Sequence, residues 1–240
     1  MKVKICGITS EADALLAVGL GADAVGFVFA PSPRQVSPRA VQQIVDRLPR
    51  EVLTVGVFRD EAPARVVDVV NRIGLGAAQL HGNETTEQTR WVAQRVPFTI
   101  RAFPAGDPGV GRIDDYGASA VLIDAASPGS GEVFDWRLAE GVVDPARLIV
   151  SGGLHAGNVG DAISHLRPFG VDVSSGVEAE PGRKDPHKLR AFVVAARKAA
   201  MEIGLGDDEL GGAWVSAADR APTEADGGDR PFDWQDEDAE

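Results

Sequence analysis

The sequence predicts a closed (β/α)8 barrel, and three observations point to this fold. Short apolar runs rich in β-forming residues alternate with helical patterns, eight times along the chain. The chain has 240 residues, which is close to the usual length of such a barrel. Glycine-rich or polar segments follow most of the runs, where a barrel collects its functional groups. An open doubly wound sheet has the same periodicity and is the alternative.

The expected strands are near-continuous apolar segments, such as residues 24–29 (AVGFVF) and 53–58 (LTVGVF). Runs of this kind are typical of a parallel sheet covered by helices. We expect the eight strands to begin near Val3, Ala24, Leu53, Ala77, Phe98, Ala120, Leu148 and Val171.

Several helices between these strands have recognisable ends. Ser37 precedes Pro38, a pattern typical of an N-cap followed by proline at the first helical position. Residues 64–73 form an expected helix that Gly74 closes. Four other segments have helical patterns, strong in the first two and weak in the last two: 85–95, 186–200, 109–116 and 136–141.

The segments that follow the strands of a barrel gather at one end, and this end carries the function. We therefore expect the site in residues 6–9, 30–34, 59–60, 81–84, 103–105, 124–131, 151–154 and 174–182.

Two of these segments, after the seventh and eighth strands, predict a phosphate site. They are Ser151-Gly152-Gly153 and Ser174-Ser175-Gly176. In many barrels these two loops and the start of a short extra helix bind phosphate, and glycines let main-chain N–H groups approach it closely. Either segment alone could be an ordinary glycine turn, but the pair at these two strand ends favours phosphate binding.

Two candidates for proton transfer also lie at strand ends. Cys6 is the only cysteine of the chain and follows the first apolar run. It is either a small buried apolar residue or a reactive thiol. Asp124 ends the sixth run and precedes the glycine- and serine-rich residues 125–131, which favours a site residue over a helix cap. A carboxyl that is partly removed from water is suited to general acid catalysis.

Arg34 and His81 follow the second and fourth strands. Arg34 is either a solvated charge or a ligand that binds a substrate carboxylate through its planar guanidinium. His81 is either a substrate contact or a hydrogen-bonded residue of the rim. No second ligand stands beside it in the sequence, so we do not expect a catalytic metal.

Lys4 and Asp172 are expected to form an ion pair inside the barrel. Side chains alternate along a strand, so Lys4 shares a face with Cys6, and Asp172 shares one with Ser174. The first and eighth strands are neighbours in a closed barrel, which brings these faces together. Because a free thiol is mostly protonated at neutral pH, we also expect some stabilisation of the Cys6 thiolate, with Lys4 as the nearest candidate.

The net charge of −12 is concentrated near the C-terminus. Residues 206–240 carry twelve acidic side chains against two arginines, a net charge of −10, which leaves about −2 for the remainder. Such a segment buries too little apolar surface to order itself. We therefore expect a barrel domain over 1–203 and an acidic, disordered tail over 204–240.

The composition narrows the class of protein. A single cysteine excludes an internal disulfide, and no run is long enough to span a bilayer. The first residues lack the apolar stretch of a signal peptide, so we do not expect one. No basic patch for nucleic acid is present. We expect a cytoplasmic protein without nucleic-acid or membrane partners, either a monomer or a homodimer.

Residues 1 to about 200 resemble the phosphoribosylanthranilate isomerase family, and the acidic tail departs from its pattern. The matching motifs are residues 4–9 (KICGIT), 26–29 (GFVF) with 32–34 (SPR), 79–82 (QLHG), 122–124 (LID), 129–131 (GSG), 134–136 (FDW), 151–154 (SGGL), 170–178 (GVDVSSGVE), 181–182 (PG) and 184–185 (KD).

This resemblance implies an Amadori rearrangement of N-(5′-phosphoribosyl)anthranilate, the third step of tryptophan synthesis from chorismate, without metal or cofactor. It implies that Cys6 is the general base and Asp124 the general acid. Arg34 would bind the anthranilate carboxylate, and the two glycine–serine loops would bind the phosphate of this small phosphoribosyl substrate.

Other phosphosugar barrels fit the sequence less well. Indole-glycerol-phosphate synthase chemistry needs a lysine at a strand end, and a metal-dependent epimerase needs several histidine and aspartate ligands; neither pattern is present. The isomerase of the histidine pathway would be expected to have aspartates after strands one and five, where this chain has Cys6 and residues 98–101 (FTIR). A non-catalytic phosphometabolite-binding barrel is the alternative from another class.

Overall fold

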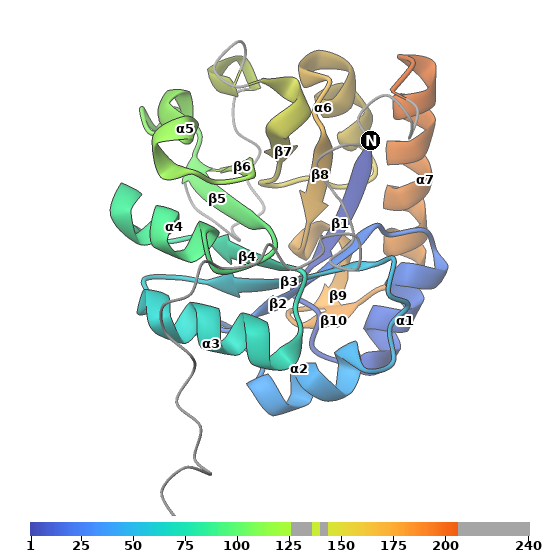
Figure 1. Cartoon of the computed structure of the whole chain (residues 1–240). Helices are drawn as coiled ribbons and strands as arrows, with labels where there is room; N and C mark the ends of the chain where they lie inside the picture. The colour runs from blue at the N-terminus through green and yellow to red at the C-terminus, as the bar shows by residue number, and fades with distance from the viewer. Residues whose placement is uncertain (126–135, 140–143, 206–240) are drawn as a thin grey trace, which may run out of the picture.

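The computed structural model describes residues 1–125, 136–139 and 144–205. Within them, eight parallel strands close into a barrel in sequence order, with β8 paired to β1 (Figure 1). The strands are β1 (Lys2–Cys6), β2 (Ala24–Val28), β3 (Leu53–Phe58), β4 (Ala77–Leu80), β5 (Thr99–Pro104), β6 (Ala120–Asp124), β7 (Leu148–Val150) and β8 (Gly170–Val173). The predicted barrel is confirmed, and each strand begins within one residue of its expected start.

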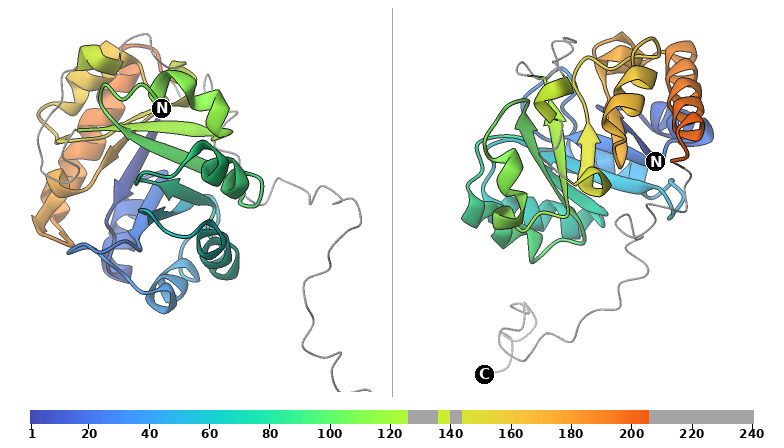
Figure 2. Two further views of the ribbon diagram at one scale, coloured as in Figure 1. Left: turned by 90° about the vertical axis from the view of Figure 1, so that its left-hand side faces the viewer. Right: turned by 90° about the horizontal axis from the view of Figure 1, so that it is seen from above.

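Helices surround the barrel on its outside, as Figure 2 shows from two further directions. They are α1 (Glu11–Gly19), α2 (Pro38–Val45), α3 (Pro63–Ile73), α4 (Thr86–Ala93), α5 (Ile113–Tyr116), α6 (Val159–Leu166) and α7 (Pro186–Glu202). The Ser37 hydroxyl accepts a hydrogen bond from the Ala40 N–H at 3.3 Å, so Ser37 caps α2 as expected. Gly74 ends α3 in the left-handed conformation, also as expected.

The described connections include four short 3₁₀ turns: η1 (Val110–Arg112), η2 (Trp136–Ala139), η3 (Pro145–Arg147) and η4 (Ser175–Val177). The weak helical pattern over 109–116 corresponds to η1 followed by α5. Of the pattern over 136–141, only η2 falls within the described residues.

A small antiparallel hairpin follows β8 and was not expected from the sequence. It consists of β9 (Glu178–Glu180) and β10 (Arg183–Lys184), and it lies between η4 and α7 (Figure 1). The main-chain N–H of Lys184 donates to Asp13 Oδ2 of α1 at 3.1 Å, so the hairpin is fixed to the first helix.

The core has two apolar layers because strand side chains alternate between the two faces of the sheet. Inside the barrel lie Val55, Ile100, Leu122, Ile149 and their neighbours. A larger cluster fills the space between the sheet and the helices. Toward the C-terminal strand ends the interior becomes polar, with buried Lys4, Gln79, Asp124, Ser151 and Asp172.

The described part of the barrel ends just after α7, at Leu205. Almost all of the segment expected to form the tail, residues 206–240, lies outside the described residues. Among the helices that the structure describes, none combines the length and apolar character that a membrane span requires.

Candidate active site

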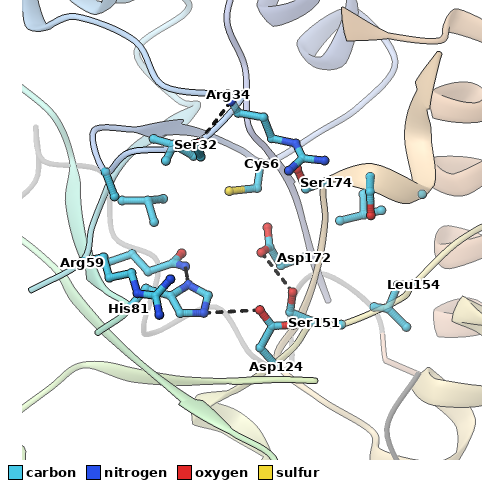
Figure 3. Close-up of a pocket in the computed structure, with 18 of the residues that line it drawn as sticks. Cys6, Ser32, Arg34, Arg59, His81, Asp124, Ser151, Leu154, Asp172 and Ser174 are labelled. Atoms are coloured by element: carbon cyan, nitrogen blue, oxygen red, sulfur yellow. Dashed lines mark hydrogen bonds and ion pairs between the residues drawn. The ribbon is translucent and has the colours of Figure 1, made fainter. Parts of the chain in front are cut away.

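One pocket at the C-terminal ends of the strands collects nearly all of the predicted site residues (Figure 3). Its wall includes Cys6, Arg34, His81, Asp124, Gly152, Gly153, Asp172, Ser174, Ser175 and Gly176. Lys4 does not line the pocket. It lies two residues before Cys6 on β1, buried on the same face of the strand. The structure therefore brings the residues selected from the sequence together at one end of the barrel.

Cys6 ends β1 and faces the barrel interior, where it is 7% exposed. Its partner in the register of β2 is Gly26. A Cβ at Gly26 would lie 2.9 Å from Cys6 Sγ and 3.1 Å from Lys4 Nζ, so glycine leaves the space that both side chains occupy. Gly7 follows with φ +72°, a left-handed conformation that turns the chain directly after the thiol.

The predicted pair between Lys4 and Asp172 is confirmed. Lys4 Nζ lies 2.8 Å from Asp172 Oδ1, and their side chains are 1% and 6% exposed. The Ser151 hydroxyl donates to Asp172 Oδ2 at 3.4 Å, which links the pair to the loop after β7.

This pair only partly meets the expectation that Lys4 stabilises the Cys6 thiolate. Burial has the largest effect on the thiol and raises its pKa. The Lys4 charge lowers the pKa and Asp172 raises it, so much of the help from Lys4 is cancelled. Lys184, which the sequence analysis did not select, also lowers it. The net result is a raised pKa for Cys6.

Asp124 lies across the pocket from Cys6 (Figure 3). Its Oδ1 accepts from the Ala125 N–H at 2.8 Å, and its Oδ2 lies 3.3 Å from His81 Nε2. The Gln79 amide donates to His81 Nδ1 at 3.0 Å, so the proton of the neutral ring is on Nε2, facing the carboxyl. His81, predicted as a substrate ligand, thus contacts the expected acid.

The His81 loop is fixed from outside the barrel by Arg101. The Arg101 guanidinium donates to the carbonyl groups on either side of His81, those of Leu80 and Gly82, both at 3.0 Å. Its Nη1 also lies 3.1 Å from Glu84 Oε2, and both side chains are buried. The position of His81 therefore depends on a buried ion pair that no local sequence pattern indicates.

The two glycine loops, predicted to bind phosphate, have conformations and packing that depend on glycine. Gly152 and Gly153 have φ of +84° and +63°, conformations that favour glycine. A Cβ on Gly176 would overlap the carbonyl oxygen of Leu154, so the loops after β7 and β8 pack together only because residue 176 has no side chain. The expected extra helix is the three-residue turn η4.

Arg34 reaches the pocket, but one edge of its guanidinium is already occupied. Nε and Nη2 donate to Glu178 Oε1 and Oε2 at 2.8 and 2.7 Å. Burial raises the pKa of Glu178, but the hydrogen bonds from Arg34 and the charge of Lys184 outweigh it and hold the pKa below its ordinary value. A substrate carboxylate can therefore meet only the remaining N–H groups of Arg34.

Several residues in or beside the pocket were not selected from the sequence. Ser32 and Arg59 line it on the β2 and β3 side. Glu178 and Lys184 come from the unexpected hairpin and lie beside the pocket, where they bond to Arg34 and to the Cys6 carbonyl. The wall near Arg34 is apolar, with Val28, Ala30, Pro31 and Val57. Within the described ranges, no group of three or more His, Cys, Asp or Glu residues is arranged to hold a metal ion.

Comparison with known proteins identifies the relatives of this chain. Residues 3–195 match the family model of N-(5′-phosphoribosyl)anthranilate (PRA) isomerase. The N-(5′-phosphoribosyl)anthranilate isomerase of Desulforudis audaxviator is 48% identical over 204 residues, which cover 82% of this chain and 98% of that protein.

Solved structures give the same result. Phosphoribosyl anthranilate isomerase from Thermus thermophilus superposes with a TM-score of 0.77 at 42% identity, covering 82% of this chain and 99% of that one. A phosphoribosyl anthranilate isomerase in complex with reduced 1-(o-carboxyphenylamino)-1-deoxyribulose 5-phosphate superposes with a TM-score of 0.73, at 42% identity and the same coverage.

Proposed function

Because this chain belongs to the N-(5′-phosphoribosyl)anthranilate isomerase family and catalyses the Amadori rearrangement of tryptophan biosynthesis, we propose that Cys6 and Asp124 perform its two proton transfers. The observation that carries this assignment is that both residues line one pocket, on different strands, beside the two glycine loops. Holding both ends of the substrate between an acid and a base converts proton transfer into a reaction within one complex.

Asp124 acts first, as the general acid. Its protonated carboxyl gives a proton to the ring oxygen of the ribose, the C1′–O bond breaks, and the anthranilate nitrogen supplies the electron pair of the iminium. The Ala125 N–H and the His81 ring hold the two carboxyl oxygens, so that Asp124 keeps one orientation in the pocket.

Cys6 acts second, as the general base. The thiolate removes the proton from C2′, the C–H electrons form the C1′–C2′ double bond, and the iminium nitrogen recovers its electron pair. The resulting enolamine tautomerises to the 1-(2-carboxyphenylamino)-1-deoxyribulose 5-phosphate product. Substrate and product are isomers: C1′ is reduced and C2′ is oxidised within one molecule, and no metal or cofactor takes part in these steps.

The substrate spans the pocket from the β7–β8 side to the β2–β3 side. Its phosphate is bound by main-chain N–H groups of Gly152, Gly153, Ser174, Ser175 and Gly176. Its anthranilate ring lies against the apolar wall near Arg34, and the free N–H groups of Arg34 bind the carboxylate. His81 contacts the substrate from the rim of the pocket, and the buried Lys4–Asp172 pair lies beneath Cys6 and links β1 to β8.

This assignment is tested by replacing the two proposed catalytic groups. We expect Cys6→Ala and Asp124→Asn each to lower kcat at least about 100-fold, because general acid–base groups contribute on that scale. Turnover is followed by the change in anthranilate fluorescence. Binding of a reduced product analogue should stay within a few-fold of the unchanged protein, which shows that the pocket is intact. Near-normal turnover of either variant would refute its role.

For the chain as a whole we propose a cytoplasmic enzyme whose barrel domain is 1–203 and whose acidic tail is 204–240. Its partner is the phosphoribosyl substrate rather than nucleic acid or a membrane. Light scattering of the purified chain would distinguish the monomer from the homodimer.

A further inference from the structure

Lys184 is a buried cation of the β9–β10 hairpin that lies beside the site without lining it. Its ammonium donates to the carbonyl oxygens of Cys6 at 2.6 Å and Ser174 at 3.2 Å, and to Glu178 Oε1 at 3.0 Å. Its side chain is fully buried. One residue of the hairpin therefore holds the main chain at the ends of both β1 and β8.

The number of these bonds fixes the charge state of Lys184. An ammonium has three N–H donors, whereas a neutral amine has two. Three acceptors surround the nitrogen, and one of them is a carboxylate. The geometry therefore requires the charged form, although burial lowers the pKa of Lys184.

The charges of the groups near Cys6 do not sum to zero. Lys4 and Asp172 form one neutral pair. On the other side of the thiol, Glu178 is shared between Arg34 and Lys184, so this cluster carries one excess positive charge. Three further ionisable groups line the pocket wall: Arg59 directly after β3, His81 directly after β4, and Asp124 at the end of β6.

We propose that Lys184 is a positioning residue for Cys6, which fixes the main chain at the thiol and supplies the excess positive charge that stabilises the thiolate. This proposal deepens the assignment of Cys6 as the base and rests on it for its catalytic meaning. It accounts for ionisation of a buried thiol whose nearest cation, Lys4, is already neutralised by Asp172.

The proposal is tested on the thiol itself, because Cys6 is the only cysteine in the 240 residues. The rate of alkylation by iodoacetamide, measured as a function of pH on the folded protein, follows the thiolate fraction of Cys6 alone. In Lys184→Met we expect this rate at neutral pH to fall about tenfold, the size of effect that one nearby charge produces. The acid limb of the kcat/KM profile should move to higher pH in parallel.

Three variants separate charge from structure. Lys184→Gln keeps a donor for one carbonyl but has no charge, so it should show the same slower alkylation even if Lys184→Met folds poorly. Lys184→Arg keeps the charge and should restore most of the rate. Arg183→Met removes an exposed cation of the same hairpin that pairs with Glu180, and it should leave both alkylation and turnover unchanged.

An alkylation profile that is the same in the folded neutral variants and the unchanged protein would overturn the proposal. This outcome is independent of whether Cys6 is the catalytic base. If alkylation slows as expected but Cys6→Ala still turns over substrate, the assignment of the base fails and the role of Lys184 in thiolate stability stands.

Discussion

Loss of one member of the buried Lys4–Asp172 pair is expected to destabilise the barrel strongly. The two charges lie 2.8 Å apart, with side chains 1% and 6% exposed. At an effective dielectric constant of about 20, their attraction is about 6 kcal/mol, and the cost of removing both from water offsets much of it. Replacing only Lys4 by Met leaves the Asp172 carboxylate buried without its counter-ion, which should cost about 3–5 kcal/mol.

Thermal unfolding measures this effect. For a domain of this size, 1 kcal/mol corresponds to about 2–4 °C in Tm, so Lys4→Met should lower Tm by about 6–20 °C. Asp172→Asn should also lower it, because the Lys4 ammonium then lacks a charged partner. In Lys4→Met/Asp172→Asn neither charge remains, so the double variant should be more stable than the sum of the two losses predicts.

Strictly additive losses in this cycle would refute the reasoning. They would mean that the two side chains contribute to stability independently and that their pairing is incidental. As a matched control, Lys198→Met removes a lysine from an exposed pair with Glu202 on α7 and should change Tm by less than about 2 °C.

Three further predictions concern the loops, the hairpin and the tail. Gly176→Ala should raise KM about tenfold or more, because its Cβ would overlap the Leu154 carbonyl and force apart the proposed phosphate loops. The control is Gly160→Ala on α6, whose Cβ would make only an ordinary contact with Ala199. An unchanged KM for Gly176→Ala would contradict the loop assignment. The ion pairs of Glu178 hold its pKa below the ordinary glutamate value. These pairs therefore stabilise the fold fully at a pH above the ordinary pKa, and the stabilisation is lost as the pH falls through the lowered pKa. The Tm difference between the unchanged protein and Glu178→Gln should therefore shrink as the pH is lowered below about 4.5, the ordinary value for glutamate, and a constant difference would argue against this linkage. Removal of residues 206–240 should leave kcat/KM within about twofold; a larger loss would show that the tail contributes to the barrel or its site.

The parts of the fold that follow from short-range pattern were accessible from the sequence. Apolar runs located every strand, and closure of the barrel made Lys4 and Asp172 neighbours although they are 168 positions apart. This prediction succeeded because the alternation of side chains and the pairing of first and last strands are fixed rules of the architecture.

The parts that depend on packing between distant loops were not accessible. Arg34 was expected to bind a substrate carboxylate through its planar guanidinium, but Glu178, 144 positions away, occupies one edge of that group. The hairpin that carries Glu178 and Lys184 is only a few residues long, and its sequence has no strong alternation. The main chain at Cys6 is likewise held by Lys184, which is 178 positions distant.

The closure of β8 onto β1 has a consequence for biosynthesis on the ribosome. Cys6 is among the first residues to leave the exit tunnel, but its neighbours Asp172 and Lys184 are among the last of the barrel. Until β8 and the hairpin have emerged, the nascent chain has an open sheet edge along β1 and lacks Lys184 and the loop after β8. Catalytic competence should therefore appear in one step, late in translation, rather than grow as the chain lengthens.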